Sequence, residues 1–276
     1  MLSRLSRVKP VMTHPIEREL GNFTFLYYSA LAAPDAILRD LRASSLIADK
    51  GRGGIRVIER EGEKLAVRAY RHGGLFRGLT GPFFLKVDRA TSEAEIMLYL
   101  RERGFPAAAP FAAVIEKLFI LRRLYLITFF EEDAAALLDY LQTCKKRERM
   151  RVAARLAELL WGLHEAGVHH RDLHLRNVLV TREHRLILLD FDRAVKKPLS
   201  PGDVESMVRR LGRFTEKMEK QGRLSLSLME KSLFLRTYAR LSGHDMTEKM
   251  RRGRTVRGFL HRTGWFIESV LFGRRK

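Results

Sequence analysis

The sequence comprises 276 residues with a net charge of +20 and a single cysteine, Cys144. Its 46% hydrophobic and 30% charged residues predict a packed globular core, in one large domain or two lobes, and exclude a disordered chain. One cysteine excludes an internal disulfide, which suits a reducing compartment. The amino terminus lacks the apolar core of a secretory signal, and the longest apolar stretch, residues 105–115, is too short to span a bilayer. We therefore expect a cytoplasmic protein, with attachment to a membrane surface still open.

The positive charge favours partners that are rich in phosphate, such as nucleic acid, anionic lipid or a phosphorylated glycolipid. The alternative is a basic enzyme with arginines scattered over its surface. No familiar nucleic-acid-binding motif is present, so nucleic acid is not an expected partner.

The first half of the chain alternates strand-like and helix-like segments. Strand-forming residues separated by turn signals predict strands at 21–31, 55–59, 65–70, 118–121 and 124–130. Helical spacing of apolar residues predicts helices at 35–48 and 91–103. The pattern breaks at residues 130–133. We therefore expect a β-rich unit over residues 1–132 and a second unit over residues 133–276.

The second unit is predicted to be mainly helical. Residues 147–166 carry apolar side chains at helical spacing on one face, which is typical of a long amphipathic helix. A segment rich in histidine, aspartate and β-formers follows, and the chain from Asp203 onward again has helical character. The expected fold class is α+β, with a small β-rich lobe and a larger helical lobe.

The segment after the long helix carries the strongest chemical pattern. Asn177 lies five residues after Asp172 and Asp190 lies eighteen residues after it, each followed by apolar, strand-like residues. Phosphoryl transfer needs metal ions on the phosphates and a nucleophile held in line, and hard oxygen ligands suit Mg²⁺. Asp172 is the candidate base, and Asn177 and Asp190 are the candidate metal ligands. Either aspartate alone would be interpreted as a turn carboxylate; the combined spacing favours a kinase-type site and a two-lobed protein-kinase-like fold.

His174 lies two residues after Asp172, where protein kinases often carry lysine. An Asp-x-His-x-x-Asn loop is similar to that of small-molecule kinases of the aminoglycoside and choline kinase type, which makes His174 a second candidate catalytic residue. The alternative is a loop histidine that hydrogen-bonds to the backbone.

Gly51, Gly53 and Gly54 are candidates for holding ATP phosphates, because glycine lets backbone amides approach a ligand closely. Their spacing is not that of a full glycine-rich phosphate loop. A hairpin turn explains the same residues equally well.

Arg68 stands in the strand position where kinases place lysine. A guanidinium can bind two phosphates bidentately, although it is not equivalent to an ammonium group. Glu95, on the following helix, is the expected ion-pair partner, with Glu93 as second choice. The alternatives are an ordinary strand arginine facing solvent and a catalytically inactive kinase fold.

Several of these segments together resemble one family more closely than kinases in general. The similar segments are Gly51 to Gly53, Val67 to Leu75, Glu95 ahead of Gly104 to Pro110, and Leu189 to Arg193. They resemble the lipopolysaccharide core kinases, which are the 3-deoxy-D-manno-octulosonic acid (Kdo) kinases and related heptose kinases of Gram-negative bacteria. The Arg-x-Tyr-Arg-x-Gly-Gly stretch is the most specific part of the resemblance. The resemblance also implies that this family uses arginine, as this chain does at Arg68, where other kinases have lysine.

The resemblance implies ATP- and Mg²⁺-dependent phosphorylation of a sugar hydroxyl in the lipopolysaccharide inner core, with Kdo attached to lipid A as the acceptor. The catalytic loop departs from the Kdo kinase pattern, because His174 stands where those enzymes typically read asparagine. Kdo, heptose or another glycolipid hydroxyl therefore remain as acceptors. Other hypotheses are a kinase for a soluble small molecule or a protein, and a pseudokinase scaffold that binds nucleotide. No Ala-Pro-Glu segment follows Asp192, which argues against a regulated protein kinase.

Basic residues suggest how an anionic acceptor is bound. The candidates near the phosphate loop are Arg71, His72, Arg77 and Lys86. Residues 249–276 combine basic side chains with apolar residues at helical spacing, which is typical of a helix lying on an anionic inner-leaflet surface. The alternative is a terminal helix packed on the large lobe. The protein is accordingly expected at the cytoplasmic face of the inner membrane.

Overall fold

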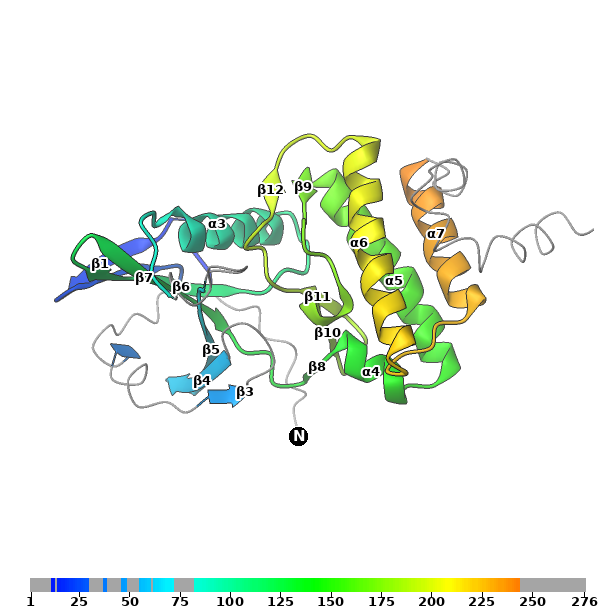
Figure 1. The fold of residues 1–276 in the computed structure, drawn as a ribbon, viewed down its shortest axis with the longest axis horizontal. Coiled ribbons are helices and arrows are strands. Elements are labelled where there is room, and N and C mark those ends of the chain that lie inside the picture. Colours follow the sequence, from blue (N-terminus) through cyan, green and yellow to red (C-terminus); the bar gives the residue numbers. More distant parts are fainter. Residues whose placement is uncertain are drawn as a thin grey trace, which may run out of the picture. The chain divides into compact units, whose positions relative to one another are not determined.

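A computed structural model describes residues 11–12, 14–29, 37–38, 46–48, 55–60, 62–71 and 82–243 (Figure 1). The chain divides into two compact units, Met1–Glu132 and Asp133–Lys276. Gly51, Gly53, Gly54, His72, Arg77 and the segment 249–276, all singled out in the sequence, lie outside the described residues. Their predicted roles remain predictions.

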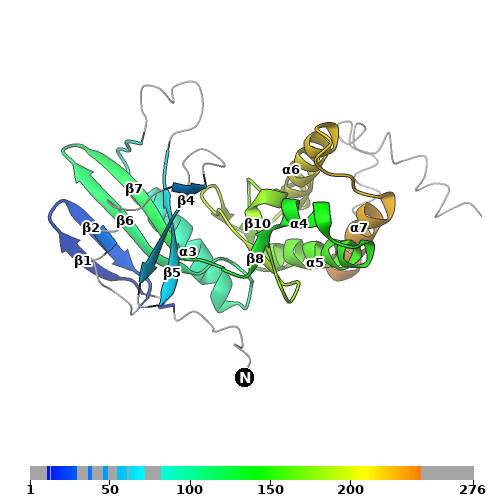
Figure 2. The ribbon, with the colours of Figure 1, turned by 90° about the horizontal axis from the view of Figure 1, so that it is seen from below.

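The described part of unit 1 is an antiparallel sheet with one long helix. The seven strands follow the order β1-β2-β6-β7-β5-β4-β3 (Figure 2). Their bounds are β1 Ile16–Leu20, β2 Phe23–Tyr27, β3 Leu46–Ala48, β4 Ile55–Arg60, β5 Glu63–Ala69, β6 Pro110–Leu118 and β7 Leu121–Phe129. Helix α3, Asp88–Glu102, packs on β6 and β7. The β-rich character predicted for this unit is confirmed.

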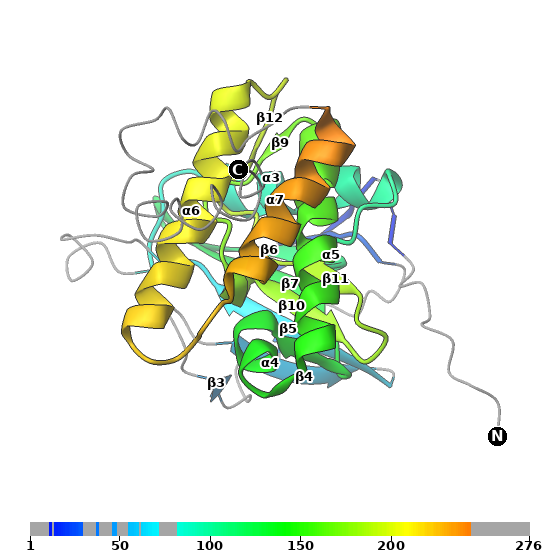
Figure 3. The same cartoon turned by 90° about the vertical axis from the view of Figure 1, so that its right-hand side faces the viewer.

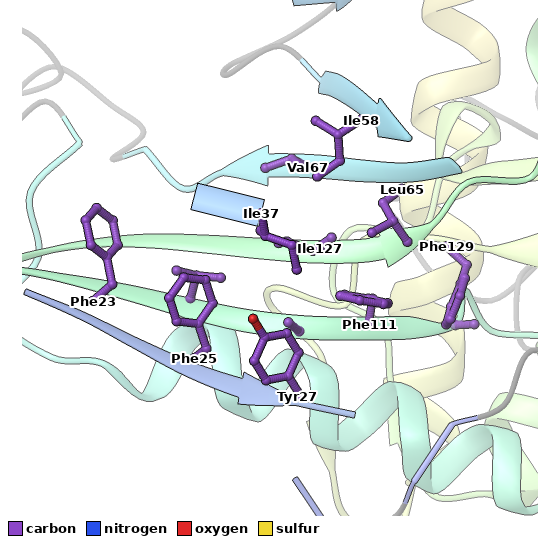
Figure 4. Close-up of a cluster of buried hydrophobic side chains, with 13 residues drawn as sticks. Phe23, Phe25, Tyr27, Ile37, Ile58, Leu65, Val67, Phe111, Ile127 and Phe129 are labelled. Atoms are coloured by element: carbon purple, nitrogen blue, oxygen red, sulfur yellow. The ribbon is translucent and has the colours of Figure 1, made fainter. Parts of the chain in front are cut away.

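Aromatic side chains build the core of unit 1. Phe25 and Tyr27 are two residues apart on one face of β2, and their rings stack with centroids 5.6 Å apart. Phe111 packs edge to face against Phe129 with centroids 5.5 Å apart (Figure 4). All four side chains are buried. Burial of each such side chain stabilises the fold by roughly 1.5–3 kcal/mol. This cluster therefore holds β2, β6 and β7 together as a rigid platform.

Two predicted elements of unit 1 are wrong in part. The sequence predicts two strands, at 118–121 and 124–130, but residues 121–129 form the single strand β7, and Phe119 and Ile120 are the turn that joins it to β6. The apolar run from Pro110 is a strand buried on both faces, so it lacks the alternation that marks a half-buried strand. The helix predicted over 35–48 ends in strand β3, which pairs with β4.

Unit 2 combines small sheets with helices. The short strands are β8 Ala134–Ala136, β9 Val168–His169, β10 Val178–Thr181, β11 Leu186–Leu188 and β12 Val195–Lys196. The helices are α4 Leu137–Thr143, α5 Lys146–Glu165, the 3-10 helix η1 Leu175–Asn177, α6 Pro201–Lys220 and α7 Leu228–Ser242. Helix α7 packs along α5 (Figure 3). The helix predicted at 147–166 is confirmed, the helical character predicted from residue 203 is confirmed as far as residue 242, and the α+β, kinase-like fold class is confirmed.

Within the described residues, none of the helices combines the length and the hydropathy that crossing a membrane requires.

Candidate active site

In unit 2 the candidate catalytic loop runs from β9 to η1. The Asn177 side chain donates from Nδ2 to the backbone carbonyl of Asp172 at 3.0 Å. The Asn177 backbone amide donates to the His174 carbonyl at 2.9 Å and closes the 3-10 turn. Asn177 is buried. Its side chain therefore fixes the backbone conformation from which the Asp172 carboxylate projects.

Asp190 is brought to the same place by strand pairing. β10 and β11 are antiparallel, with Val178 opposite Leu188. One step further, the Leu189 amide donates to the Asn177 carbonyl at 2.7 Å. Asp190 follows immediately and has a φ of 59°, a left-handed conformation that is uncommon outside glycine. The two candidate metal ligands thus come from neighbouring backbone positions, although they are thirteen residues apart in sequence.

These two residues fit the requirements of a Mg²⁺ ion. Because Asn177 uses Nδ2 for the Asp172 carbonyl, its Oδ1 atom is the one that could bind a metal. Asp190 supplies a carboxylate. Both are hard oxygen donors of the kind that Mg²⁺ prefers.

His170 supports this arrangement and was missed from the sequence. Its ring is buried against Phe191 at 5.1 Å, and its Nε2 atom donates to the Leu189 carbonyl at 3.2 Å. Burial lowers the pKa of His170, so the ring is neutral at pH 7. In the described part of the chain its Nδ1 atom is buried without a hydrogen-bond partner, which also fits a neutral ring. The signal in the sequence was the histidine two residues before Asp172.

The Asp172 carboxylate is engaged by Arg210, which lies 38 residues away on α6. The Arg210 Nη2 atom donates to Asp172 Oδ1, and both side chains are part-exposed, at 44% and 31%. No sequence signal distinguished Arg210 from the many other basic residues of this chain.

His174 lies beside the same carboxylate oxygen without a direct hydrogen bond, since its Nε2 atom is 3.9 Å from Asp172 Oδ1. Its ring stacks on Phe214 of α6, with centroids 4.8 Å apart and an interplanar angle of 19°. Burial lowers the pKa of His174, while the nearby Asp172 opposes that effect. A neutral ring stacked on an aromatic side chain positions the loop against α6.

The amino-terminal part of α6 is fastened to the catalytic loop. His169, in β9, shares a 2.8 Å hydrogen bond between its Nε2 atom and Ser206 Oγ. Ser200 caps the helix by accepting from the Asp203 amide. Lys197 and Ser200 hydrogen-bond to the Asp203 carboxyl group and hold its pKa well below the usual range. These contacts set where Arg210 and Phe214 lie further along the helix.

In unit 1 the structure corrects the partner of Arg68. Its Nη2 atom pairs with Glu93 rather than Glu95. Buried residues of α3 recur at Ala90, Glu93, Ala94 and Met97, so Glu93 lies on the inward stripe. Glu95 is two residues further, about 200° around the helix, and is exposed. The Glu93 side chain is fully buried, whereas 27% of Arg68 is exposed.

Tyr70 is a third member of this cluster that the sequence reasoning missed. Its hydroxyl donates to Glu93 Oε2, and Arg68 Nη2 donates to the Tyr70 oxygen at 3.3 Å. The Arg68 guanidinium also lies 4.8 Å from the centre of the Tyr70 ring. A buried carboxylate requires such partners. The Arg-x-Tyr spacing, which places both side chains on one side of the chain, was the available signal.

One unit is β-rich and has a partly buried arginine–glutamate pair between a strand and a helix. The other is helical and brings Asp172, Asn177 and Asp190 together. These features define the protein-kinase-like class. The family model described as "Lipopolysaccharide kinase (Kdo/WaaP) family" matches residues 38–238. The chain therefore belongs to the lipopolysaccharide kinase (Kdo/WaaP) family.

Three relatives named 3-deoxy-D-manno-octulosonic acid kinase are similar to this chain. The Vibrio cholerae protein is 28% identical over 147 residues, covering 52% of this chain and 62% of its own. The Vibrio parahaemolyticus protein is 26% identical over 175 residues, covering 62% and 73%. The Stenotrophomonas maltophilia (strain K279a) protein is 27% identical over 242 residues, covering 83% and 86%. The match to the Vibrio cholerae relative thus spans about three fifths of that protein.

Proposed function

We propose that this protein is a Mg²⁺- and ATP-dependent kinase that phosphorylates a sugar hydroxyl of the lipopolysaccharide inner core, with Kdo attached to lipid A as the acceptor. Family membership and the printed names of the relatives support this reaction class. The observation that carries the proposal is the Asn177 side chain holding the Asp172 backbone, with Asp190 one residue beyond the Leu189–Asn177 hydrogen bond.

Asp172 acts as the general base. Its carboxylate orients the acceptor hydroxyl and accepts its proton as the oxygen attacks the γ-phosphorus, while ADP leaves with the electrons of the broken bond. A Mg²⁺ ion held by Asn177 and Asp190 would neutralise charge on the phosphates. Asn177 thus has two tasks, because the same amide that fixes Asp172 presents Oδ1 for the metal.

Arg68 binds phosphate oxygens of the nucleotide. A guanidinium stays protonated at any physiological pH and can make two parallel hydrogen bonds. Glu93 and Tyr70 hold its Nη2 atom from the buried side and fix the orientation of the guanidinium. In this proposal arginine takes the phosphate-binding role of the usual kinase lysine.

The acceptor is proposed to be presented at the cytoplasmic face of the inner membrane, since lipid A is a membrane lipid. The net charge of +20 suits both the phosphorylated glycolipid and an anionic leaflet.

The test is phosphate transfer from γ-labelled ATP to Kdo–lipid A, comparing the wild type with Asp172→Asn. The variant keeps the shape of the side chain but removes the base, and we expect a loss of roughly 10²–10⁴-fold in kcat. Asp139→Asn, an exposed aspartate of α4, is the matched control. Equal rates for wild type and Asp172→Asn would remove Asp172 from its role, and transfer to free Kdo without any lipid requirement would favour a soluble acceptor.

A second candidate function is a nucleotide-binding scaffold without phosphotransfer. The contact between Arg210 and Asp172 favours it, because the guanidinium occupies the carboxylate oxygen Oδ1. ATP binding by the wild type without transfer to Kdo–lipid A, to heptose-containing acceptors or to free sugars would select this candidate.

A further inference from the structure

The turn between β6 and β7 carries two large apolar residues in water. Phe119 is 99% exposed and Ile120 is 71% exposed. Leu85 is 75% exposed. These three are the most exposed large apolar side chains in the part of the chain that the structure describes. We call them the apolar tip.

The three residues of the apolar tip are neighbours in space. Phe84 and Arg122 exchange two backbone hydrogen bonds of 2.7 Å, which places Leu85 next to the start of β7. Arg122 then donates from Nη1 to the carbonyls of Phe119 and Leu121, at 2.8 and 2.9 Å. A single arginine thus holds the turn and the adjoining segment together. Figure 2 shows the β6–β7 turn at the end of the sheet beside the β1–β2 turn.

Turn chemistry does not explain this choice of residues. Phe119 has a φ of 60°, the left-handed conformation in which a two-residue hairpin turn favours glycine. The β1–β2 turn has Gly21 with a φ of 57°, and the β4–β5 turn has Gly62 with a φ of 77°. Two hairpins of the same sheet therefore follow the rule, while the third holds a strained phenylalanine in full solvent exposure. Such an outlier is a reason to look for a function.

Basic side chains outnumber acidic ones beside the apolar tip. Within three residues of its members lie Lys86, Lys117, Arg122 and Arg123, against Asp88 and Glu116. Lys86 and Lys117 are exposed. Lys117 also pairs with Glu19 at 2.6 Å, so it is held at the base of the hairpin. Apolar side chains at the end of a protrusion, with an excess of positive charge behind them, fit a bilayer interface of anionic lipid, which offers acyl chains below a layer of negative charge.

We propose that the apolar tip inserts into the headgroup region of an anionic lipid surface, with Phe119 and Ile120 entering the acyl boundary. The aromatic core of β2, β6 and β7 gives the hairpin a rigid base, so insertion requires no unfolding. This surface goes beyond the proposed phosphotransfer, because lipid binding takes place without nucleotide or acceptor.

The test is co-sedimentation of the full-length protein with vesicles of phosphatidylglycerol and phosphatidylethanolamine, which contain no lipopolysaccharide. The double variant Phe119→Ser/Ile120→Ser is compared with Met229→Ser, which removes a 56% exposed apolar side chain from α7. We expect the vesicle partition coefficient of the double variant to fall at least about tenfold, because the variant lacks the two apolar side chains whose transfer from water into lipid favours binding. Met229→Ser should bind like the wild type. Identical partitioning of the double variant and the wild type overturns the proposal.

A second measurement locates the inserted residues, and it also tests the proposal if the double variant does not fold. Phe119→Trp and Met229→Trp place a fluorophore at the apolar tip and on α7, with the wild type as the background for the two native tryptophans. Brominated acyl chains should quench the added tryptophan at position 119 and leave that at position 229 unchanged. No quenching at position 119, or self-association through the apolar tip without vesicle binding, overturns the proposal.

Discussion

Arg210 of α6 donates to the carboxylate of Asp172, although 38 residues separate them. The contact is possible because the hydrogen bond between His169 and Ser206 fastens α6 to the catalytic loop. Arg210 is therefore placed to set the direction of the carboxylate that is proposed to receive the acceptor proton.

Variants of Arg210 test whether this residue positions the Asp172 carboxylate or only adds positive charge to the surface. We expect Arg210→Ala to lower kcat about 10–100-fold with little change in the KM for ATP, because the base loses its orientation while the phosphate contacts stay. Arg210→Lys should recover part of the loss by restoring one hydrogen bond. Arg213→Ala, an exposed arginine of the same helix, is the control. A faster Arg210→Ala enzyme would instead make the contact inhibitory.

Glu93 and Glu95 lie on the same helix, one buried and one exposed, so the same substitution at both tests how much the contact with Arg68 stabilises unit 1. Glu93→Gln leaves the Arg68 guanidinium without its buried counter-charge, which we expect to cost about 2–3 kcal/mol of unfolding free energy, below the value for a fully buried pair because Arg68 is partly exposed. Glu95→Gln should change stability by less than about 0.5 kcal/mol, as for other exposed sites. Urea denaturation measures both. Equal losses would mean that Glu93 contributes no more than a surface carboxylate.

Asp190 should govern the requirement for metal. Asp190→Asn removes one formal charge from the proposed Mg²⁺ site, and we expect the Mg²⁺ concentration for half-maximal turnover to rise at least about tenfold. The Mg²⁺ titration of phosphate transfer measures this, with Asp139→Asn as the unchanged control. A Mg²⁺ dependence like that of the wild type would exclude Asp190 as a ligand.

His170 predicts a pH dependence of stability. Burial lowers the pKa of His170 in the folded state, so below about pH 6.5 the unfolded chain binds a proton that the folded chain does not. Stability is present above that pH and falls as the pH decreases, by up to about 1.4 kcal/mol per pH unit for one proton.

The measurement is the urea unfolding free energy between pH 7.5 and 5. His170→Phe should flatten the curve relative to the wild type, whereas His14→Gln, with an exposed ring, should leave its slope unchanged. A slope in His170→Phe as steep as in the wild type would assign the effect to another group.

The sequence by itself determined the features that depend on local spacing. Asp172, Asn177 and Asp190 could be recognised because the short turn of η1 and the β10–β11 pairing keep residues close in sequence close in space. The β-rich and helical units and the long helix α5 followed from apolar periodicity. The protein-kinase-like class followed from the same loop and its spacing.

Only the tertiary structure decided the contacts between distant segments. Which of Glu93 and Glu95 faces Arg68 depends on the rotation of α3 against the sheet, and that rotation is set by packing of Ala90, Ala94 and Met97. Arg210 reaches Asp172 because α6 is fastened to β9. The turn at Phe119 and Ile120 violates the glycine rule for such hairpins, so pairing between whole strands, and not local preference, places it there. Packing energies of this kind exceed local preferences, which is why spacing alone does not reveal them.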